Sequence, residues 1–282
     1  MQSALEAAAL VGYVTDWHEQ QLDSRWSMAY AAGLGDMRPG YFDNTDGRPL
    51  ATHPLFPVCL EWPALVASLA ANGVDMRRTV HATHDLHIAR PLVPPERLAT
   101  RGTIVGVEQR KPGIYLVWRF DTVDSAGRPV CHTWQGNLFL GAQLVGDACW
   151  TATQPAVPIA ASGSALSPIE IVLPANLAHV YTECARIWNP LHTDAAVAAA
   201  AGVGQPILHG TATLALAVNA VIDHASAGNQ RIVRRLGGRF AAMVTVPGRL
   251  RVHARKVDAD NLAFCVMNDA GATAIRDGYV CF

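Results

Sequence analysis

Hydrophobic and polar residues alternate with a period of two in eight stretches of the chain, four in each half. Such alternation, rich in β-branched and aromatic residues, is typical of strands with one buried face. The pattern predicts strands over 80–88, 98–107, 114–123 and 130–140 in the first half, and over 232–242, 249–256, 263–268 and 274–282 in the second. Each half is therefore expected to be built on a β-sheet.

Helices are predicted ahead of the strands in each half. The expected helices cover 23–33, 61–72, 193–201 and 211–224. Asp23 or Ser24 is the expected N-cap of the first helix, and Gly202 is expected to end the third.

The helix over 211–224 is apolar on nearly every face. A helix with this pattern is buried on all sides. Its apolar part has only about half the length needed to cross a bilayer. A sheet must therefore wrap around it, and a strongly curved antiparallel sheet around one central helix is the hot-dog fold.

Two segments of the first half recur in the second half at nearly the same spacing. Residues 35–43 (GDMRPGYFD) align with 186–194 (RIWNPLHTD) at an offset of 151 positions. Residues 95–98 (PERL) align with 247–250 (PGRL) at an offset of 152. Because the two offsets agree and the order is the same, the sequence predicts an internal duplication.

The duplication divides the chain into two expected modules, 1–145 and 168–282. Between them, 146–167 is rich in Ala, Thr, Pro, Ser and Gly and nearly free of charge, which is typical of a linker. The predicted fold class is α+β: a double hot-dog, with two curved antiparallel sheets that each wrap around a central helix.

Composition argues against several partners. The net charge is −1 and the basic residues form no stripe, so neither nucleic acid nor a membrane is an expected partner. The six cysteines are scattered with no C-x-x-C pair, so no zinc site is expected, and no other metal or cofactor is predicted. Scattered cysteines, and an N-terminus over 1–6 without a basic start or a long apolar run, favour the cytoplasm.

The densest polar cluster in an apolar setting lies in 186–194, followed by 205–211 (QPILHGT). These two segments resemble the signature of the MaoC-like, (R)-specific enoyl-CoA hydratase family, in which Gly-Asp-x-Asn-Pro-Leu/Ile-His-x-Asp precedes Pro-Ile-Leu-His-Gly. The resemblance implies a double hot-dog whose first module is degenerate. It also implies reversible syn addition of water to a trans-2-enoyl thioester of CoA or of a carrier protein.

One residue of that signature is missing. The family's aspartate falls at Ile187, which cannot hold or transfer a proton, and the preceding glycine is Arg186. Loss of a positioned acid–base group typically costs about 10²- to 10⁴-fold in rate. The first module keeps the aspartate as Asp36 but has Tyr41 at the histidine position and Arg38 at the asparagine position. The resemblance implies that the two half-sites lie well apart, so Asp36 is not expected to complement His192.

Three residues are the expected catalytic group. His192 can exchange protons near neutral pH and is the expected acid–base residue. Gly210 opens the buried helix, whose free N–H groups can stabilise charge on a thioester carbonyl, and glycine allows close approach of a ligand. Asn189 is expected either to orient the attacking water or to cap the short helix that follows.

Further residues are expected at the substrate, namely Ile187, Asp194, His209, Arg186 and Trp62. Glu183, Asp194 or His209 is an alternative acid–base group in place of the lost aspartate. Structural roles stay open: Asp194 suits a helix start, His209 a turn support, and Trp188 core packing.

Two other groups have competing interpretations. His81, His84 and His87 recur at period three along a predicted strand, so they cannot all share one face and a metal site there is not expected. Four arginines of the second half suit a solvated strand face, or else contact with the phosphates of a CoA-type carrier. They are Arg231, Arg234, Arg235 and Arg239.

Three functions remain open on sequence alone. The first is a hydratase or dehydratase acting on an acyl thioester by an altered mechanism centred on His192. The second is a protein that binds acyl thioesters without turnover, and the third is a thioesterase, which fold analogy alone supports. Both a monomer and a homodimer are plausible, because a double hot-dog already contains the pairing that single modules reach by dimerising.

Overall fold

The computed structural model describes residues 4–158, 163–226 and 232–282. Arg231 and the first three residues, on which part of the sequence interpretation depended, lie outside these ranges. The first module contains β2 (His18–Leu22), α2 (Ser24–Gly33), η1 (Pro39–Tyr41), α3 (Pro57–Ala71), η2 (Met76–Arg78), β3 (Thr79–Ile88), β4 (Glu96–Arg110), β5 (Gly113–Asp124) and β6 (Pro129–Leu140).

The second module repeats the order of the strands and of the longer helices. It contains β10 (Ile169–Leu173), α4 (Leu177–Ala185), η3 (Pro190–His192), α5 (Ala195–Ala200), α6 (Gly210–Ser226), β11 (Arg235–Phe240), β12 (Gly248–Lys256), β13 (Asn261–Asn268) and β14 (Thr273–Cys281). Short elements flank or join the modules: β1 (Ala4–Glu6), α1 (Ala7–Leu10), β7 (Gln143–Val145), β8 (Cys149–Trp150) and β9 (Ser164–Ala165).

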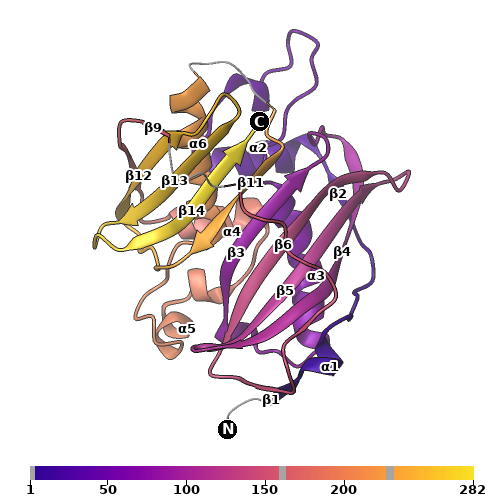
Figure 1. Cartoon of the computed structure of the whole chain (residues 1–282). Coiled ribbons are helices and arrows are strands. Elements are labelled where there is room, and N and C mark those ends of the chain that lie inside the picture. Colours follow the sequence, from indigo (N-terminus) through magenta and orange to yellow (C-terminus); the bar gives the residue numbers. More distant parts are fainter. Residues whose placement is uncertain (1–3, 159–162, 227–231) are drawn as a thin grey trace.

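One continuous antiparallel sheet joins both modules, in the order β10-β12-β13-β14-β11-β3-β6-β5-β4-β2. On both sides of the central β3–β11 pair, equivalent strands of the two modules follow one another in the same order. In the central pair, Asp85 lies opposite Gly237. Each half of the sheet curves around its own long helix, α3 or α6, which lies behind the strands in Figure 1. The predicted double hot-dog and the duplication are therefore confirmed.

The long helix of the second module is buried as its sequence predicts. Leu214, Val218 and Val221 of α6 have no exposed surface, and they pack in the same core as Leu236 and Val280 of the sheet. Burial of this kind contributes about 25 cal/mol per Å² of apolar surface. Among the described residues, no helix is both long enough and apolar enough to cross a membrane.

Helices α2 and α4 pack against each other where the two modules meet. Gly33 allows this contact, because a Cβ there would lie 2.8 Å from the Cβ of Cys184. The Tyr30 and Tyr181 hydroxyls, which are equivalent in the repeat, lie 3.4 Å apart between these helices. This pseudosymmetric contact holds the segments that follow each helix, 35–43 and 186–194, in equivalent positions.

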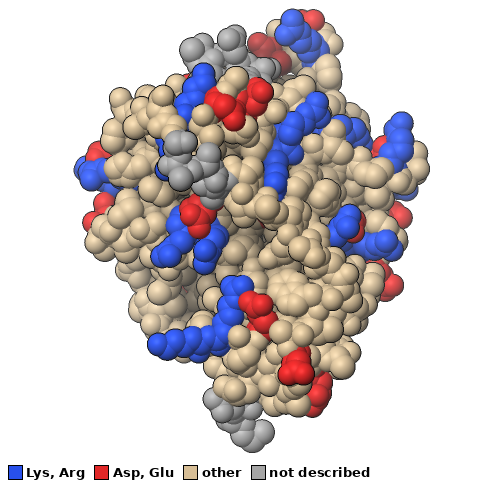
Figure 2. All heavy atoms as spheres, in the orientation of Figure 1, with Lys and Arg blue, Asp and Glu red and all other residues tan. Residues whose placement is uncertain are grey.

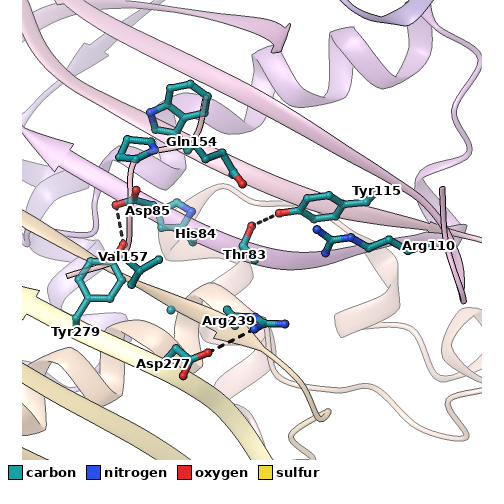
Figure 3. Close-up of a pocket in the computed structure, with 13 residues that line it drawn as sticks. Thr83, His84, Asp85, Arg110, Tyr115, Gln154, Val157, Arg239, Asp277 and Tyr279 are labelled. Carbon is teal, nitrogen blue, oxygen red and sulfur yellow. Dashed lines mark hydrogen bonds and ion pairs between the residues drawn. The ribbon is translucent and has the colours of Figure 1, made fainter. Parts of the chain in front are cut away.

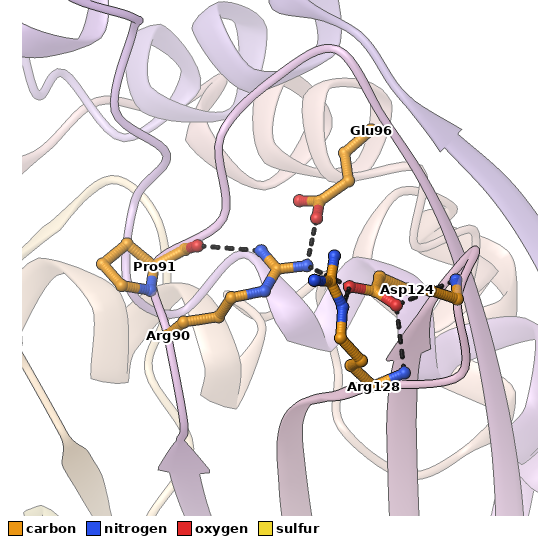
Figure 4. Close-up of polar contacts among 6 residues, drawn as sticks. Arg90, Pro91, Glu96, Asp124 and Arg128 are labelled. Atoms are coloured by element: carbon orange, nitrogen blue, oxygen red, sulfur yellow. Dashed lines mark hydrogen bonds and ion pairs between the residues drawn. The ribbon is translucent and has the colours of Figure 1, made fainter.

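A cluster of charged side chains holds the connection from β3 to β4 against the turn between β5 and β6 (Figure 4). Arg90 contacts both Glu96 and Asp124, and Asp124 also accepts hydrogen bonds from the backbone N–H of Arg128 at 3.0 Å and from its Nε at 2.9 Å. The cluster fixes one end of the first sheet and has no contact with the candidate site.

Several sequence predictions need correction. Helix α3 begins at Pro57, four residues before the predicted start. Strands β2 and β10 and helix α4 were not predicted, and short strands β8 and β9 lie inside the proposed linker. Glu183, one of the alternative acid–base groups, lies in α4. The module boundaries at 145 and 168 stay predictions.

Candidate functional site

His192 lies at the end of a single 3-10 turn that its own sequence stabilises. Asn189 caps this turn, since its Oδ1 accepts a hydrogen bond from the N–H of Leu191 at 3.1 Å. Pro190 at the first position has a φ angle suited to a helix start. Asn189 therefore caps this 3-10 turn, whereas the short helix α5, which it was expected to cap, has Asp194 as its N-cap.

The hydrogen bonding of His192 selects one tautomer. Its Nδ1 lies 2.8 Å from the carbonyl oxygen of Ile207, and since a carbonyl only accepts, Nδ1 carries the hydrogen. Burial lowers the pKa of His192 to about 4, against which the bond to Ile207 acts only partly. At neutral pH the ring is therefore uncharged, and its Nε2 carries a lone pair that can accept a proton.

A second histidine supports this ring. The His209 ring stacks on His192 with centroids 3.6 Å apart and an angle of 27° between the planes. Thr182 donates its hydroxyl to the Ala178 carbonyl, so its Oγ1 accepts from His209 Nε2 at 3.3 Å. Burial, followed by the neighbouring His192, lowers the pKa of His209 well below its usual value. Both stacked rings are thus neutral, and His209 acts as a rigid support.

The amino end of α6 lies directly beside these rings. Gly210 is the first residue of the helix and follows His209. A Cβ at Gly210 would lie 3.1 Å from the ring of Phe240 on β11, so this position has little room for any side chain. The first turn of a helix has N–H groups without intrahelical partners and a positive electrostatic potential. A thioester carbonyl placed there would be stabilised as it gains negative charge.

The position of the lost acid is apolar. Ile187 is 6% exposed and belongs to a hydrophobic core that residues of both modules form. Arg186 ends α4 in the left-handed conformation with φ of 57°, which favours glycine, the residue that the family signature has there. Its guanidinium stacks over the indole of Trp26 at 4.0 Å, and this cation–π contact offsets part of the strain. Arg186 is therefore engaged with the first module.

The remaining predicted site residues have structural contacts. The Oδ1 of Asp194 caps α5 by accepting from the N–H groups of Ala196 and Val197, at 2.8 and 3.1 Å. Trp62 of α3 is half-buried and packs against two hydrophobic clusters. Trp188 is 57% exposed, so its predicted core packing is wrong, and its Nε1 lies 3.4 Å from Glu183.

The equivalent segment of the first module belongs to a polar network, in which Oδ2 of Asp36 is the one buried oxygen without a hydrogen-bond partner among the described residues. Arg38 Nε donates to Asp223 of α6 at 2.9 Å and lies 3.6 Å from the buried Asp36. His53 accepts from the Leu55 N–H, so its Nε2 donates to Asn219 Oδ1 at 2.7 Å. Asn219 lies nine residues beyond Gly210, roughly 13 Å along α6. Asp36 therefore lies far from His192, as the resemblance implied.

The outer face of the two central strands carries a groove of about 330 Å³ (Figure 3). In it, Asp85 accepts hydrogen bonds from Arg235 and Tyr279 at 2.8 and 2.6 Å, and Arg239 lies 3.5 Å from Asp277. The expectation that Arg235 belongs to a solvated face is wrong, since its side chain is 17% exposed and paired. Elsewhere on this side of the molecule, basic and acidic groups are interspersed on a largely uncharged surface (Figure 2).

Comparison with known proteins identifies both halves. Residues 154–274 match the model of the MaoC like domain, and residues 9–133 match that of the FAS1-like dehydratase domain region. The second module is a MaoC-like domain. The family recognised from residues 186–194 and 205–211 is thereby confirmed.

Individual relatives agree with this assignment. The chain is 26% identical to the peroxisomal multifunctional enzyme type 2 of Drosophila melanogaster in an alignment of 277 residues, which covers 92% of this chain and 45% of that protein. It is 42% identical over 57 residues to the peroxisomal enoyl-CoA hydratase 2 of Arabidopsis thaliana, covering 20% of this chain and 18% of that one. The chain thus spans less than half the length of these curated relatives.

A solved structure has the same fold over nearly the whole chain. The MaoC-like dehydratase from Phytophthora capsici superposes with a TM-score of 0.84 at 20% identity, covering 97% of this chain and 96% of that one. The MaoC-like domain and the dehydratase-like region therefore form one double hot-dog.

Proposed function

We propose that this MaoC-like protein adds water reversibly to a 2-enoyl thioester, most simply an acyl-CoA, with His192 as the principal acid–base residue. The observation that carries the proposal is the Nδ1 bond from His192 to Ile207, which leaves Nε2 unprotonated on a ring that stacks on His209, the residue before α6. The MaoC-like family model and the hydratase named among the relatives support the same reaction class.

The reaction can be balanced with the residues present. Nε2 of His192 takes a proton from water as the water oxygen bonds to C3 of the enoyl group. The π electrons of the double bond move toward the thioester carbonyl, whose oxygen accepts hydrogen bonds from the N–H groups at the start of α6. The protonated His192 then returns its proton to C2, which gives the 3-hydroxyacyl thioester and restores the neutral ring.

The missing aspartate supports a second candidate. Because Ile187 supplies no proton-transfer group, the chain would bind an acyl thioester without turnover if His192 alone cannot complete both steps. A thioesterase has less support, since Asp194 is engaged as a helix cap. The cytoplasmic location stays a prediction. CoA and a carrier protein both stay open as the carrier of the acyl group, and so do a monomer and a homodimer.

One assay separates these functions. Purified protein is incubated with short and medium trans-2-enoyl-CoA substrates, and loss of the conjugated thioester is followed together with release of free thiol. The proposal predicts loss of conjugation without free thiol. Free thiol would instead indicate hydrolysis, and saturable binding without either change would indicate a binding protein.

A further inference from the structure

A β-bulge in β3 brings two histidines to the inner face of the sheet. The register between β3 and β6 shifts between His81 and Thr83, so the strict alternation of faces is interrupted there. The rings of His81 and His84 lie 5.4 Å apart as a result. His87 lies on the outer face with Asp85, to which its Nε2 is bonded at 3.1 Å. The bulge therefore places two of the three histidine rings on the same face, although the residues are spaced three apart.

The inner face of the neighbouring strand β6 continues this polar group. Gln135 lies opposite both His84 and Trp118 in the ladder, and Trp118 bonds to Ser68 of α3, which places all three strand residues on the helix side. Asn137 lies opposite His81. His84, Gln135 and Asn137 are 1%, 5% and 3% exposed. We call His81, His84, Gln135 and Asn137 the inner polar row.

His84 has unused hydrogen-bonding capacity. Neither Nδ1 nor Nε2 of its ring has a hydrogen-bond partner among the described residues. The residue opposite it on β11 is Gly238, which has no side chain to supply one. A second unpaired group lies between helix α3 and strand β6. The buried Glu61 of α3 accepts a hydrogen bond from the Thr133 hydroxyl of β6 with Oε1, while its Oε2 has no partner in the described structure. Unpaired buried polar groups cost stability, so their retention points to a ligand.

The inner polar row is connected to the candidate site. Phe240 lies against Gly210 at the start of α6, and its ring centroid is 4.6 Å from that of His81. The contacts therefore run from His192 and Gly210 through Phe240 to His81 and then His84. A thioester carbonyl held at Gly210 would therefore be separated from His81 by one side chain, that of Phe240.

We propose that the inner polar row binds a hydroxyl group on the acyl chain, several carbons from the thioester, and that the enzyme prefers hydroxylated enoyl thioesters. A neutral imidazole offers one donor and one acceptor on different sides of its ring, and a hydroxyl group, which can both donate and accept, can pair with either of them. This inference rests on the proposed hydratase function and names its substrate class. A site built to bond a hydroxyl discriminates strongly against the analogue that lacks it.

The test compares matched substrates. Values of kcat/KM for hydration are measured with trans-2-decenoyl-CoA and with a series carrying one hydroxyl at successive carbons from C5 to C10. The expected result is a preference of at least about tenfold for one hydroxylated position over the plain chain. Equal values across the series, or a preference for the plain chain, would overturn the proposal.

Variants assign the preference to His84. His84→Leu is expected to reduce the ratio of the two kcat/KM values to about one, whereas His84→Asn, which keeps one donor and one acceptor, retains it. His87→Leu on the outer face of the same strand is the matched control and leaves the ratio unchanged. A merely structural His84 would lower the melting temperature when replaced by Leu and leave the ratio intact. The proposal predicts a higher melting temperature, because an unpaired buried group is removed.

Binding measurements separate this inference from the proposed function. If the protein hydrates neither substrate, the hydratase proposal fails, and calorimetric dissociation constants for saturated decanoyl-CoA and its hydroxylated counterpart test the row by itself. Tighter binding of the hydroxylated ligand by tenfold, lost in His84→Leu, would still support the row. Equal dissociation constants would refute it.

Discussion

The polar groups of the two equivalent half-sites in this duplicated fold have different hydrogen-bond partners. In the first module, Arg38 lies between Asp36 and Asp223, and both nitrogens of His53 are bonded. In the second module, His192 is bonded to Ile207 through Nδ1, and its Nε2 has no hydrogen-bond partner in the part of the chain that the structure describes. The comparison teaches that the same turn can hold an arginine between two carboxylates in one module and present a neutral imidazole beside a helix start in the other.

The largest expected effect breaks the second half-site. His192→Ala removes the only group assigned to proton transfer and should lower kcat/KM for enoyl-CoA hydration by about 10²- to 10⁴-fold. His253→Ala, on the exposed face of β12, is the control and should leave the rate unchanged. Retention of wild-type rates in His192→Ala would show that another residue is the base.

The next effect breaks the first half-site and appears in stability. Arg38→Met leaves the carboxylate of Asp36, which is 7% exposed, without its cation. Removing one partner of a buried pair is strongly destabilising, and because Arg38 is partly exposed we expect a loss of about 2 kcal/mol in the free energy of unfolding. Urea titration measures it, and the double variant Asp36→Asn/Arg38→Met should recover part of the loss. Equal stability of all three proteins would show that the network is not structural.

The smallest effect sharpens the comparison by restoring the lost acid. Ile187→Asp places a carboxyl group in the family's position, and it should raise kcat for hydration by about tenfold if the site is a degraded form of the family's. Ile187→Asn, similar in size but unable to transfer a proton, is the matched control. A gain in both variants, or in neither, would point to a site adapted to different chemistry.

The sequence predicted those features that depend on local pattern. The all-round apolar character of 211–224 indicated a sheet-wrapped helix. The two motifs indicated that His192 and Gly210 belong to one site, and in the structure His192 stacks on His209, the neighbour of Gly210. Asp194 was also predicted as a helix start, and it caps α5.

Features that depend on tertiary contacts could not be predicted. Strand β2 (His18–Leu22) has an almost wholly polar sequence and is held by its ladder with β4. The bulge that places His81 beside His84 depends on the register with β6. The strain of the left-handed φ of Arg186 is offset in part by Trp26, which comes from the other module and lies under the guanidinium.

The ionisation of His192 is the central claim, and nitrogen NMR of the histidine rings tests it most directly. The account predicts a neutral ring protonated at Nδ1 at pH 7, with a pKa of about 4. Since this value lies below the ordinary 6.5 of an unfolded chain, His192 should also make the fold less stable as the pH falls from about 6.5 toward 4. A ring protonated at Nε2, or a pKa at or above 6.5, would contradict the account.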